Sequence, residues 1–196
     1  MRGDRRLFSD VNIAVKPGSW VQLTGPNGSG KTSLLRMICG LLEPAEGDIR
    51  WQGQNIRSLR EDYFSELTYL GHRNGVKEEL TAIENLRCAS GLSGVELSND
   101  AAISALRDFG LEGRELLPAR SLSEGQRRRL ALARLKVSQT ALWVLDEVLT
   151  SLDRAATGLI QSILASHVAN GGIALVATHQ DLDLSAGSSQ RIQLSL

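Results

Sequence analysis

The chain has 196 residues, of which 42% are hydrophobic and 22% are charged. A chain of this size buries enough surface for one globular domain, or for one domain with a small inserted subdomain. Lys plus Arg equal Asp plus Glu at 22 each, so the formal net charge is zero. This balance argues against a dedicated nucleic-acid binder, which usually carries a basic excess or stripe.

Signal, membrane and cysteine patterns favour a cytoplasmic protein. Residues 1–6 are charged and lack the apolar core of a secretory signal. No apolar run approaches the roughly 20 residues of a membrane-spanning helix, so a membrane part would come from another chain. Cys39 and Cys88 lie far apart in apolar, helix-like stretches. We expect both to be buried, reduced thiols, as suits the cytoplasm.

The first third of the chain alternates strand and helix patterns around a glycine-rich segment. Residues 20–24 predict a strand that leads into the glycines, and residues 31–39 predict a helix that follows them, with Gly40 as its stop. Residues 48–52 alternate as a half-solvated antiparallel strand does, and residues 67–70 predict another short strand.

The middle of the chain has a helical pattern. Thr81 and Glu84 form a capping-box pattern that predicts the start of a helix. After a loop at residues 90–98, Asn99 or Asp100 can cap a second helix. We therefore expect residues 76–122 to form a small helical subdomain, inserted into a core made of residues 1–75 and 123–196.

The last third predicts a parallel sheet. Residues 141–145 and 173–177 are near-continuous apolar runs, typical of strands buried on both faces. A helix predicted at residues 155–169 would make the crossover between them, and residues 191–196 predict a final edge strand. The fold class is thus α/β, with a mainly parallel core sheet, a small antiparallel β part and an inserted helical subdomain.

The glycine-rich segment matches the phosphate-loop pattern G-x-x-x-x-G-K-[ST] completely and lies between a predicted strand and a predicted helix. Its glycines allow successive N–H groups to face an anion, and the following helix presents its positive end. Lys31 is expected to reach the β- and γ-phosphates of ATP, and the Thr32 hydroxyl to ligate Mg²⁺. The candidate ATP-binding residues are Gly25, Pro26, Asn27, Gly28, Ser29, Gly30, Lys31 and Thr32.

Two carboxylates follow the buried run at residues 141–145. Asp146 ends that run and is placed to hold Mg²⁺ beside the phosphate loop. Glu147 is placed to orient or deprotonate a water aimed at the γ-phosphate. An acidic pair after a strand is more often a turn feature, but the phosphate loop favours the catalytic interpretation.

A further anion site is predicted at residues 122–126, Leu-Ser-Glu-Gly-Gln. Ser123 and Gln126 form a capping box, so this segment opens a helix. An exposed hydroxyl and a glycine at a helix N-terminus also suit an anion.

Residues 122–126 resemble the signature of ABC ATPases, a branch of the P-loop NTPases, with Glu124 where glycine is commonest. Residues 151–153 resemble their D-loop, and Thr178-His179 resembles their switch histidine. The resemblance implies head-to-tail pairs in which each ATP lies between one phosphate loop and the partner's signature helix. It also implies that His179 contacts the γ-phosphate and that Asp153 couples the two sites. The residues that the resemblance implies contact the partner's ATP are Ser123, Glu124, Gly125 and Gln126.

Residues 69–77 and 80–86 resemble, more narrowly, the ATP-binding subunits of bacterial cytochrome c maturation, which show Leu-Gly-His where most ABC domains carry glutamine. The resemblance implies a peripheral protein on the cytoplasmic face of the inner membrane, with two copies bound to a separate, CcmB-like membrane-spanning permease. It implies that ATP hydrolysis drives haem export or the release of a haem-loaded chaperone. His72 is then either a coupling residue that faces the permease or a plain loop contact.

The chain also departs from the family pattern. We expect it to lack most of the family's first strand and the aromatic residue that stacks on adenine, since Phe8 lies too close to the next extended segment to replace it. Val148 stands where proline usually follows the catalytic glutamate. No Cys-x-x-Cys-His motif indicates a haem site, and His167 is expected on a helix surface.

Three other functions compete with this interpretation. The chain could be the ATPase of another small importer or exporter. A soluble ABC protein that acts on DNA or ribosomes is disfavoured by the neutral charge and by the absence of a long coiled-coil insert or a second cassette. A module that binds ATP without hydrolysing it is disfavoured by the presence of Lys31, Asp146, Glu147 and His179. The shortened start and Glu124 keep this alternative open.

Overall fold

The protein is described by a computed structural model that covers residues 7–71, 73–150, 152–180, 182 and 184–194. A five-stranded sheet in the order β4-β5-β6-β1-β7 forms its centre, and all four strand pairs are parallel. The strands are β1 (Ser19–Thr24), β4 (Leu67–Leu70), β5 (Leu142–Asp146), β6 (Ile173–Ala177) and β7 (Ser188–Gln193). The predicted parallel core sheet is confirmed.

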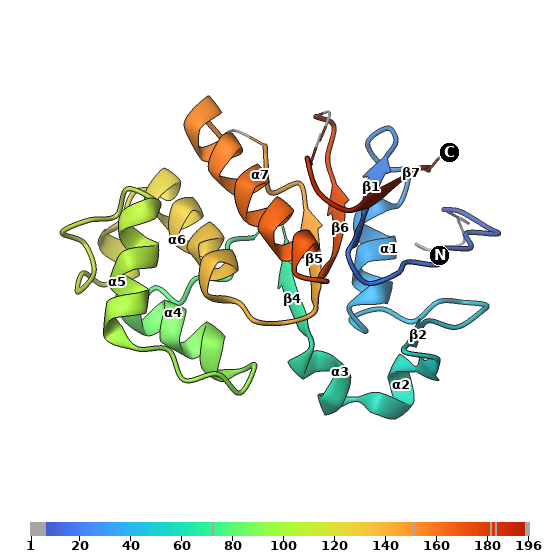
Figure 1. Cartoon of the computed structure of the whole chain (residues 1–196), viewed down its shortest axis with the longest axis horizontal. Coiled ribbons are helices and arrows are strands. Elements are labelled where there is room, and N and C mark those ends of the chain that lie inside the picture. The colour runs from blue at the N-terminus through green and yellow to red at the C-terminus, as the bar shows by residue number, and fades with distance from the viewer. Residues whose placement is uncertain (1–6, 72, 151, 181, 183, 195–196) are drawn as a thin grey trace.

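Helices cover both faces of the sheet (Figure 1). On β5, Leu142 and Val144 pack in a cluster with the leucines of α1 (Lys31–Ile38). The alternate residues Trp143 and Leu145 pack on the other face, against α6 (Glu124–Val137) and α7 (Arg154–Ala169). Because successive side chains of a strand point to opposite faces, the continuous apolar run of β5 serves both layers.

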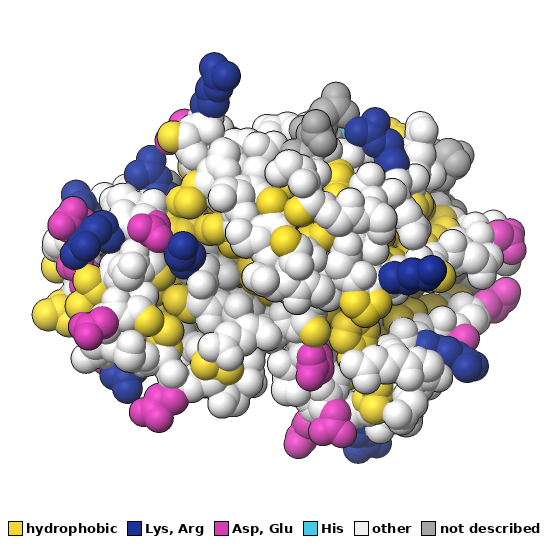
Figure 2. Space-filling view, in the orientation of Figure 1, with side chains coloured by type: hydrophobic (Ala, Val, Ile, Leu, Met, Phe, Trp, Pro, Cys, Tyr) yellow, Lys and Arg dark blue, Asp and Glu magenta, His cyan; other side chains and the backbone are white. Residues whose placement is uncertain are grey.

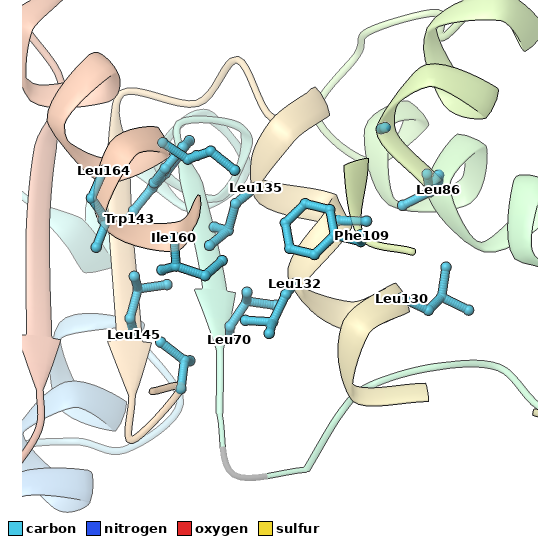
Figure 3. Close-up of a cluster of buried hydrophobic side chains, with 14 of the residues drawn as sticks. Leu70, Leu86, Phe109, Leu130, Leu132, Leu135, Trp143, Leu145, Ile160 and Leu164 are labelled. Atoms are coloured by element: carbon cyan, nitrogen blue, oxygen red, sulfur yellow. The ribbon is translucent and has the colours of Figure 1, made fainter. Parts of the chain in front are cut away.

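The middle of the chain is helical, as predicted. The helices α4 (Ala82–Gly91) and α5 (Asn99–Asp108) pack on each other and on α6, and a 3-10 turn (Ala119–Ser121) leads back to α6. Their buried side chains join those of β5 and α7 in one cluster (Figure 3). The helix α6 therefore packs on both the helices and the sheet. The subdomain boundaries at residues 76 and 122 remain a prediction.

A small β pair lies beside α1. The strands β2 (Arg50–Trp51) and β3 (Gln54–Asn55) are antiparallel and are followed by two short helices, α2 (Ile56–Leu59) and α3 (Glu61–Ser65). The predicted antiparallel strand is confirmed but spans only two residues of the expected range. The short helices were not predicted, since four or five residues carry too little periodicity to distinguish them from a turn.

The helix ends follow their local signals. Both predicted capping boxes are formed, at Thr81 for α4 and at Ser123 for α6. The helix α1 ends at Ile38, and the φ of 67° at Gly40, just beyond the C-cap, allows the N–H of Leu41 to donate to the carbonyl of Arg36 at 2.9 Å. This is the Schellman arrangement that glycine favours.

Several local expectations were wrong. Ser98, rather than Asn99 or Asp100, caps α5, because its Oγ accepts the N–H of Ala101 at 3.2 Å. The predicted final edge strand is present as β7, but it begins at Ser188, three residues before the predicted start, and residues 195–196 of the prediction lie outside the described residues. Its register follows the pairing of Ser188 with Ser19 across the sheet, which no local pattern encodes.

The two cysteines and His167 also differ in part from expectation. Cys39 is buried as predicted, and burial, with a smaller effect of the nearby Asp146 charge, raises its pKa to about 12. Cys88 is exposed, because α4 turns the opposite face, with Ile83 and Leu86, toward the core. His167 is half-buried rather than on the helix surface.

The surface carries mixed charge on the face shown in Figure 2, where basic and acidic side chains are interspersed. Within the residues that the structure describes, no helix is long and apolar enough to cross a membrane.

Candidate functional site

The phosphate loop connects the end of β1 to the start of α1. Its backbone has positive φ at Gly25 (142°), Gly28 (85°) and Gly30 (99°), which side-chain-bearing residues rarely adopt. A Cβ on Gly25 would lie 2.3 Å from the carbonyl oxygen of Leu194. Glycine at residue 25 thus allows the loop to approach the main chain that follows β7 closely.

The N-terminus of α1 is open toward this loop. Its N-cap is Gly30, and no side chain caps it. The first N–H groups of a helix have no intrahelical acceptor, so those of Lys31 and Thr32 are available to an anion. A Cβ on Gly28 would meet nothing within 4 Å. The loop is therefore a cradle of N–H groups with open space in front of it.

Lys31 lies within the cradle and is 6% exposed. Its ammonium donates hydrogen bonds to the carbonyls of Gly25, at 2.8 Å, and Pro26, at 3.3 Å. Its Nζ also lies 3.9 Å from Glu147 Oε1. A buried ammonium held mainly by neutral carbonyls would gain free energy from an added anion.

A cavity of about 390 Å³ opens in front of the loop. Phosphate-loop residues and Glu147 share its lining, which is polar enough for a charged ligand. The Oγ of Ser29, a residue of the loop itself, is fully buried and has no hydrogen-bond partner among the described residues. The lining residues are Leu7, Asn27, Gly28, Gly30, Lys31, Thr32, Ser33 and Glu147.

The carboxylate pair lies at the carboxyl end of β5, next to this cavity. Asp146 is the last residue of β5 and is 2% exposed. Glu147 follows with φ of 54°, one of four positive-φ residues other than glycine in the described part of the chain. Its side chain is 31% exposed and its Oε1 lies 3.4 Å from His179 Nε2. The turn at Glu147 thus points one carboxylate into the cavity while the other remains buried.

His179 follows the end of β6 and meets the phosphate loop. Its Nε2 lies 3.1 Å from Asn27 Oδ1 and 3.4 Å from Lys31 Nζ. The structure thus brings together Lys31, Glu147 and His179, which the sequence places far apart. Because the carboxyl ends of β1, β5 and β6 lie at one edge of the sheet, each strand delivers one member of this cluster.

The segment of residues 123–126 lies at the start of α6. Ser123 caps the helix, and Ser123, Glu124 and Gly125 are exposed. The Glu124 carboxylate accepts hydrogen bonds from Asn74 Nδ2 at 3.0 Å and from Arg127 Nη2 at 3.0 Å. None of these signature residues lines the cavity at the phosphate loop.

Asp153 begins α7. One carboxylate oxygen accepts the N–H of Ala156 at 2.7 Å, and the other accepts a hydrogen bond from Arg129 at 3.3 Å. Asp153 therefore caps α7 and connects it to α6. Ser151 and His72, the other predicted residues of these loops, lie outside the described residues.

Sequence reasoning missed Asn74 and Arg128 at this site and considered Phe8 only as a replacement for the adenine-stacking aromatic. The Phe8 ring lies against the phosphate loop, since a Cβ on Gly30 would be 2.8 Å from its Cδ1. Asn74 and Arg128 connect the signature segment to Glu147 through side-chain hydrogen bonds. Three consecutive arginines on a helix suggest a solvated face, so no local signal distinguished Arg128 from its neighbours.

The chain is similar to known proteins over most of its length. The family model described as ABC transporter matches residues 8–150. The cytochrome c biogenesis ATP-binding export protein CcmA of Nitrosospira multiformis is 56% identical over 195 residues, which cover 100% of this chain and 95% of that protein.

Two solved structures share the fold. One, described as an ATP-binding subunit of an ABC transporter, has a TM-score of 0.81 at 28% identity and covers 90% of this chain and 75% of that one. The other is the ATP-binding cassette MJ0796 in a dimeric, post-hydrolysis state bound to ADP and Pi. It has a TM-score of 0.76 at 25% identity and covers 89% of this chain and 80% of that one.

Proposed function

The chain belongs to the ABC transporter family of ATP-binding proteins, and from that premise we propose that it hydrolyses ATP to energise an inner-membrane complex for cytochrome c maturation. The observation that carries the chemistry is the cluster of Lys31, Glu147 and His179 around one cavity. The similarity to CcmA over the whole chain supports the biological process.

ATP binding uses the phosphate loop. The N–H groups of Lys31 and Thr32, at the uncapped N-terminus of α1, face the phosphates together with the positive end of that helix. The Lys31 ammonium exchanges the carbonyls of Gly25 and Pro26 for phosphate oxygens, which bind it more strongly because they are charged. The polar cavity in front of the loop has room for these groups.

Hydrolysis uses Glu147 and His179. The Glu147 carboxylate orients a water and accepts its proton while the water oxygen forms a bond to the γ-phosphorus. The bond between the γ-phosphorus and the bridging oxygen breaks, and ADP and phosphate leave. His179 lies beside both Lys31 and Glu147, so it can donate a hydrogen bond to the γ-phosphate.

Magnesium accompanies ATP in this proposal, and Thr32 and Asp146 would hold it. Thr32 is exposed in the lining of the cavity, and Asp146 is the buried last residue of β5. Both offer oxygen ligands, which Mg²⁺ prefers, and it needs few of them because it keeps several waters. When bound, the ion neutralises charge on the β- and γ-phosphate oxygens.

Two copies of the chain work as a pair. The segment from Ser123 to Gln126, whose first three residues are exposed, lies outside the lining of its own subunit's cavity. This supports the proposal that it binds the ATP of a partner copy. Asp153, bound to Arg129 of the signature helix, is placed to couple the two sites. The dimeric state of the MJ0796 cassette with ADP and Pi supports this arrangement.

The pair is proposed to bind a CcmB-like permease at the cytoplasmic face of the bacterial inner membrane, as a peripheral subunit. His72 is proposed to face this permease and to couple its movement to the ATP site. ATP hydrolysis then drives haem export or the release of a haem-loaded chaperone. The name of the Nitrosospira relative, an export protein of cytochrome c biogenesis, supports this assignment.

The test is complementation of a bacterium that lacks its own subunit, with ATPase activity measured on the co-purified membrane complex. The wild-type chain is expected to restore covalent cytochrome c and Mg²⁺-dependent turnover. Glu147→Gln is expected to abolish both while ATP binding persists. Glu112→Gln is the matched control and should behave as wild type, since the Glu112 side chain is 72% exposed.

The outcomes separate the parts of the proposal. Turnover without restored cytochrome c would assign the chain to another small ABC transporter. Unchanged turnover in Glu147→Gln would remove Glu147 from catalysis.

A further inference from the structure

Arg128 is the middle of three arginines in the first turns of α6, and each has a different partner. Arg127 binds Glu124 and the carbonyl of Leu122, and Arg129 binds Asp153. Arg128 instead points inward, where its Nη2 donates to the main-chain carbonyl of Glu147 at 3.1 Å. Arg128 therefore connects the signature helix to the main chain of Glu147, the residue whose carboxylate is proposed to act on the water.

Asn74 orients this guanidinium. Its Oδ1 accepts a hydrogen bond from Arg128 Nη1 at 3.2 Å, and its Nδ2 donates to Glu124 Oε1 at 3.0 Å. Asn74 thus uses both ends of its amide in one chain of contacts, Glu124–Asn74–Arg128–Glu147. The chain begins at an exposed signature residue, 77% open to solvent, and ends at the main chain beside the cavity.

Glu147 needs such support because of its backbone. Its φ of 54° is a conformation that persists in a non-glycine residue only where the surroundings hold it. Its N–H donates to the carbonyl of Ala177 at 2.9 Å, and its carbonyl accepts from the N–H of Thr150 at 3.3 Å. Arg128 supplies the second donor to that carbonyl and the only charged side chain among these described contacts.

Burial strengthens the contact. Arg128 is half-buried, and desolvation lowers its pKa from the ordinary value, although a guanidinium remains charged. A charged donor makes stronger hydrogen bonds than a neutral one, and more so when it is partly removed from water. The rigid guanidinium of arginine also directs its N–H groups more closely than the flexible ammonium of lysine does.

We propose that Arg128 is a positioning residue for ATP hydrolysis, which, oriented by Asn74, fixes the main chain of Glu147 so that its carboxylate faces the γ-phosphate. Asn74 is itself bound to Glu124 in the signature segment. The ATP of a partner subunit that docks at this segment can therefore adjust the position of Glu147 in this subunit's own ATP site. The inference rests on the proposed role of Glu147.

The experiment measures ATPase kinetics of the complex with Arg128→Gln, Arg128→Lys and Asn74→Ala. A misplaced catalytic group costs rate more than binding, so Arg128→Gln is expected to lower kcat by roughly tenfold to a hundredfold, with KM for ATP within about twofold of wild type. Arg128→Lys should recover part of this loss, because an ammonium can reach one of the two acceptors but not both. Arg107→Gln, an exposed arginine on α5, is the matched control and should leave kcat unchanged.

A double-mutant cycle tests whether Asn74 acts through Arg128. If it does, Asn74→Ala lowers kcat alone but adds nothing to Arg128→Gln. Fully multiplicative losses would overturn the chain of contacts. Asn74 lies in a loop, so its variant keeps the proposal testable if Arg128→Gln fails to fold.

Two results would overturn the positioning role. One is an unchanged kcat in Arg128→Gln that retains a wild-type melting profile. The other is a loss confined to KM, which would indicate a binding or purely structural contact. Failure of the proposed function looks different, because Glu147→Gln would then leave hydrolysis intact.

Discussion

Lys31 and His179 are 148 positions apart in the sequence, and their side-chain nitrogens lie 3.4 Å apart. The contact forms because β1 and β6 are neighbours in the sheet, so that Leu23 pairs with Ala177 just before the two loops. It places an imidazole beside the ammonium proposed to bind the β- and γ-phosphates. The γ-phosphate would therefore lie within reach of both.

His179→Ala is predicted to reduce kcat for ATP by on the order of a hundredfold, as expected when one donor to a developing charge is removed. ATP binding should persist, because the phosphate loop does not depend on His179 for its backbone shape. Steady-state ATPase and equilibrium nucleotide binding measure the two effects. An unchanged kcat would place His179 outside the reaction.

Gly25→Ala is predicted to abolish ATP binding and to destabilise the fold by about 1–3 kcal/mol, since the added Cβ overpacks the loop. The clash is with the main-chain carbonyl of Leu194, at 2.3 Å, which no rotamer change relieves. Gly53→Ala is the control, because Gly53 also has positive φ but a Cβ there meets nothing within 4 Å. Nucleotide titration and urea unfolding should separate the two variants, and equal effects would contradict the steric argument.

Turnover per subunit is predicted to fall on dilution. The signature segment lies outside the lining of its own subunit's cavity, so a monomer would hold ATP without Ser123 and Gly125 of a partner. A dilution series, with the oligomeric state measured at each concentration, checks this. Constant activity per subunit in demonstrably monomeric protein would refute it.

His167→Phe is predicted to make stability less sensitive to acid. The imidazole stacks on Trp143 with ring centroids 3.8 Å apart, and burial lowers its pKa from the ordinary 6.5, although the carbonyl of Ile173 opposes this. Because the folded state binds the proton less readily than the unfolded state, this contribution to stability is present above pH 6.5 and is lost as the pH falls below it.

The measurement is urea unfolding of wild type and His167→Phe at pH 7 and pH 5. Phenylalanine keeps the stack on Trp143 but cannot bind a proton, so the wild type should lose more free energy of unfolding between the two values. Equal losses would show that His167 does not contribute to acid sensitivity.

Local signals in the sequence determined most elements and the phosphate-binding loop. A capping box such as Thr81 with Glu84, a glycine stop such as Gly40 and an apolar run such as residues 173–177 act through neighbours within one or two turns. The phosphate loop is equally local, because its glycines and the helix after it are contiguous. These features were therefore predictable from spacing alone.

The tertiary structure decided which distant residues meet. The exposure of Cys88 depends on which of its own faces α4 turns toward α5 and α6. The register of β7 depends on its pairing with β1. The contacts of Arg128 with Asn74 and Glu147 join a loop, a helix and a strand end. The two neighbouring arginines have the same local sequence pattern, so that pattern could not identify Arg128. Spacing along the chain does not encode these contacts, because they form only when packed elements bring polar groups together out of water.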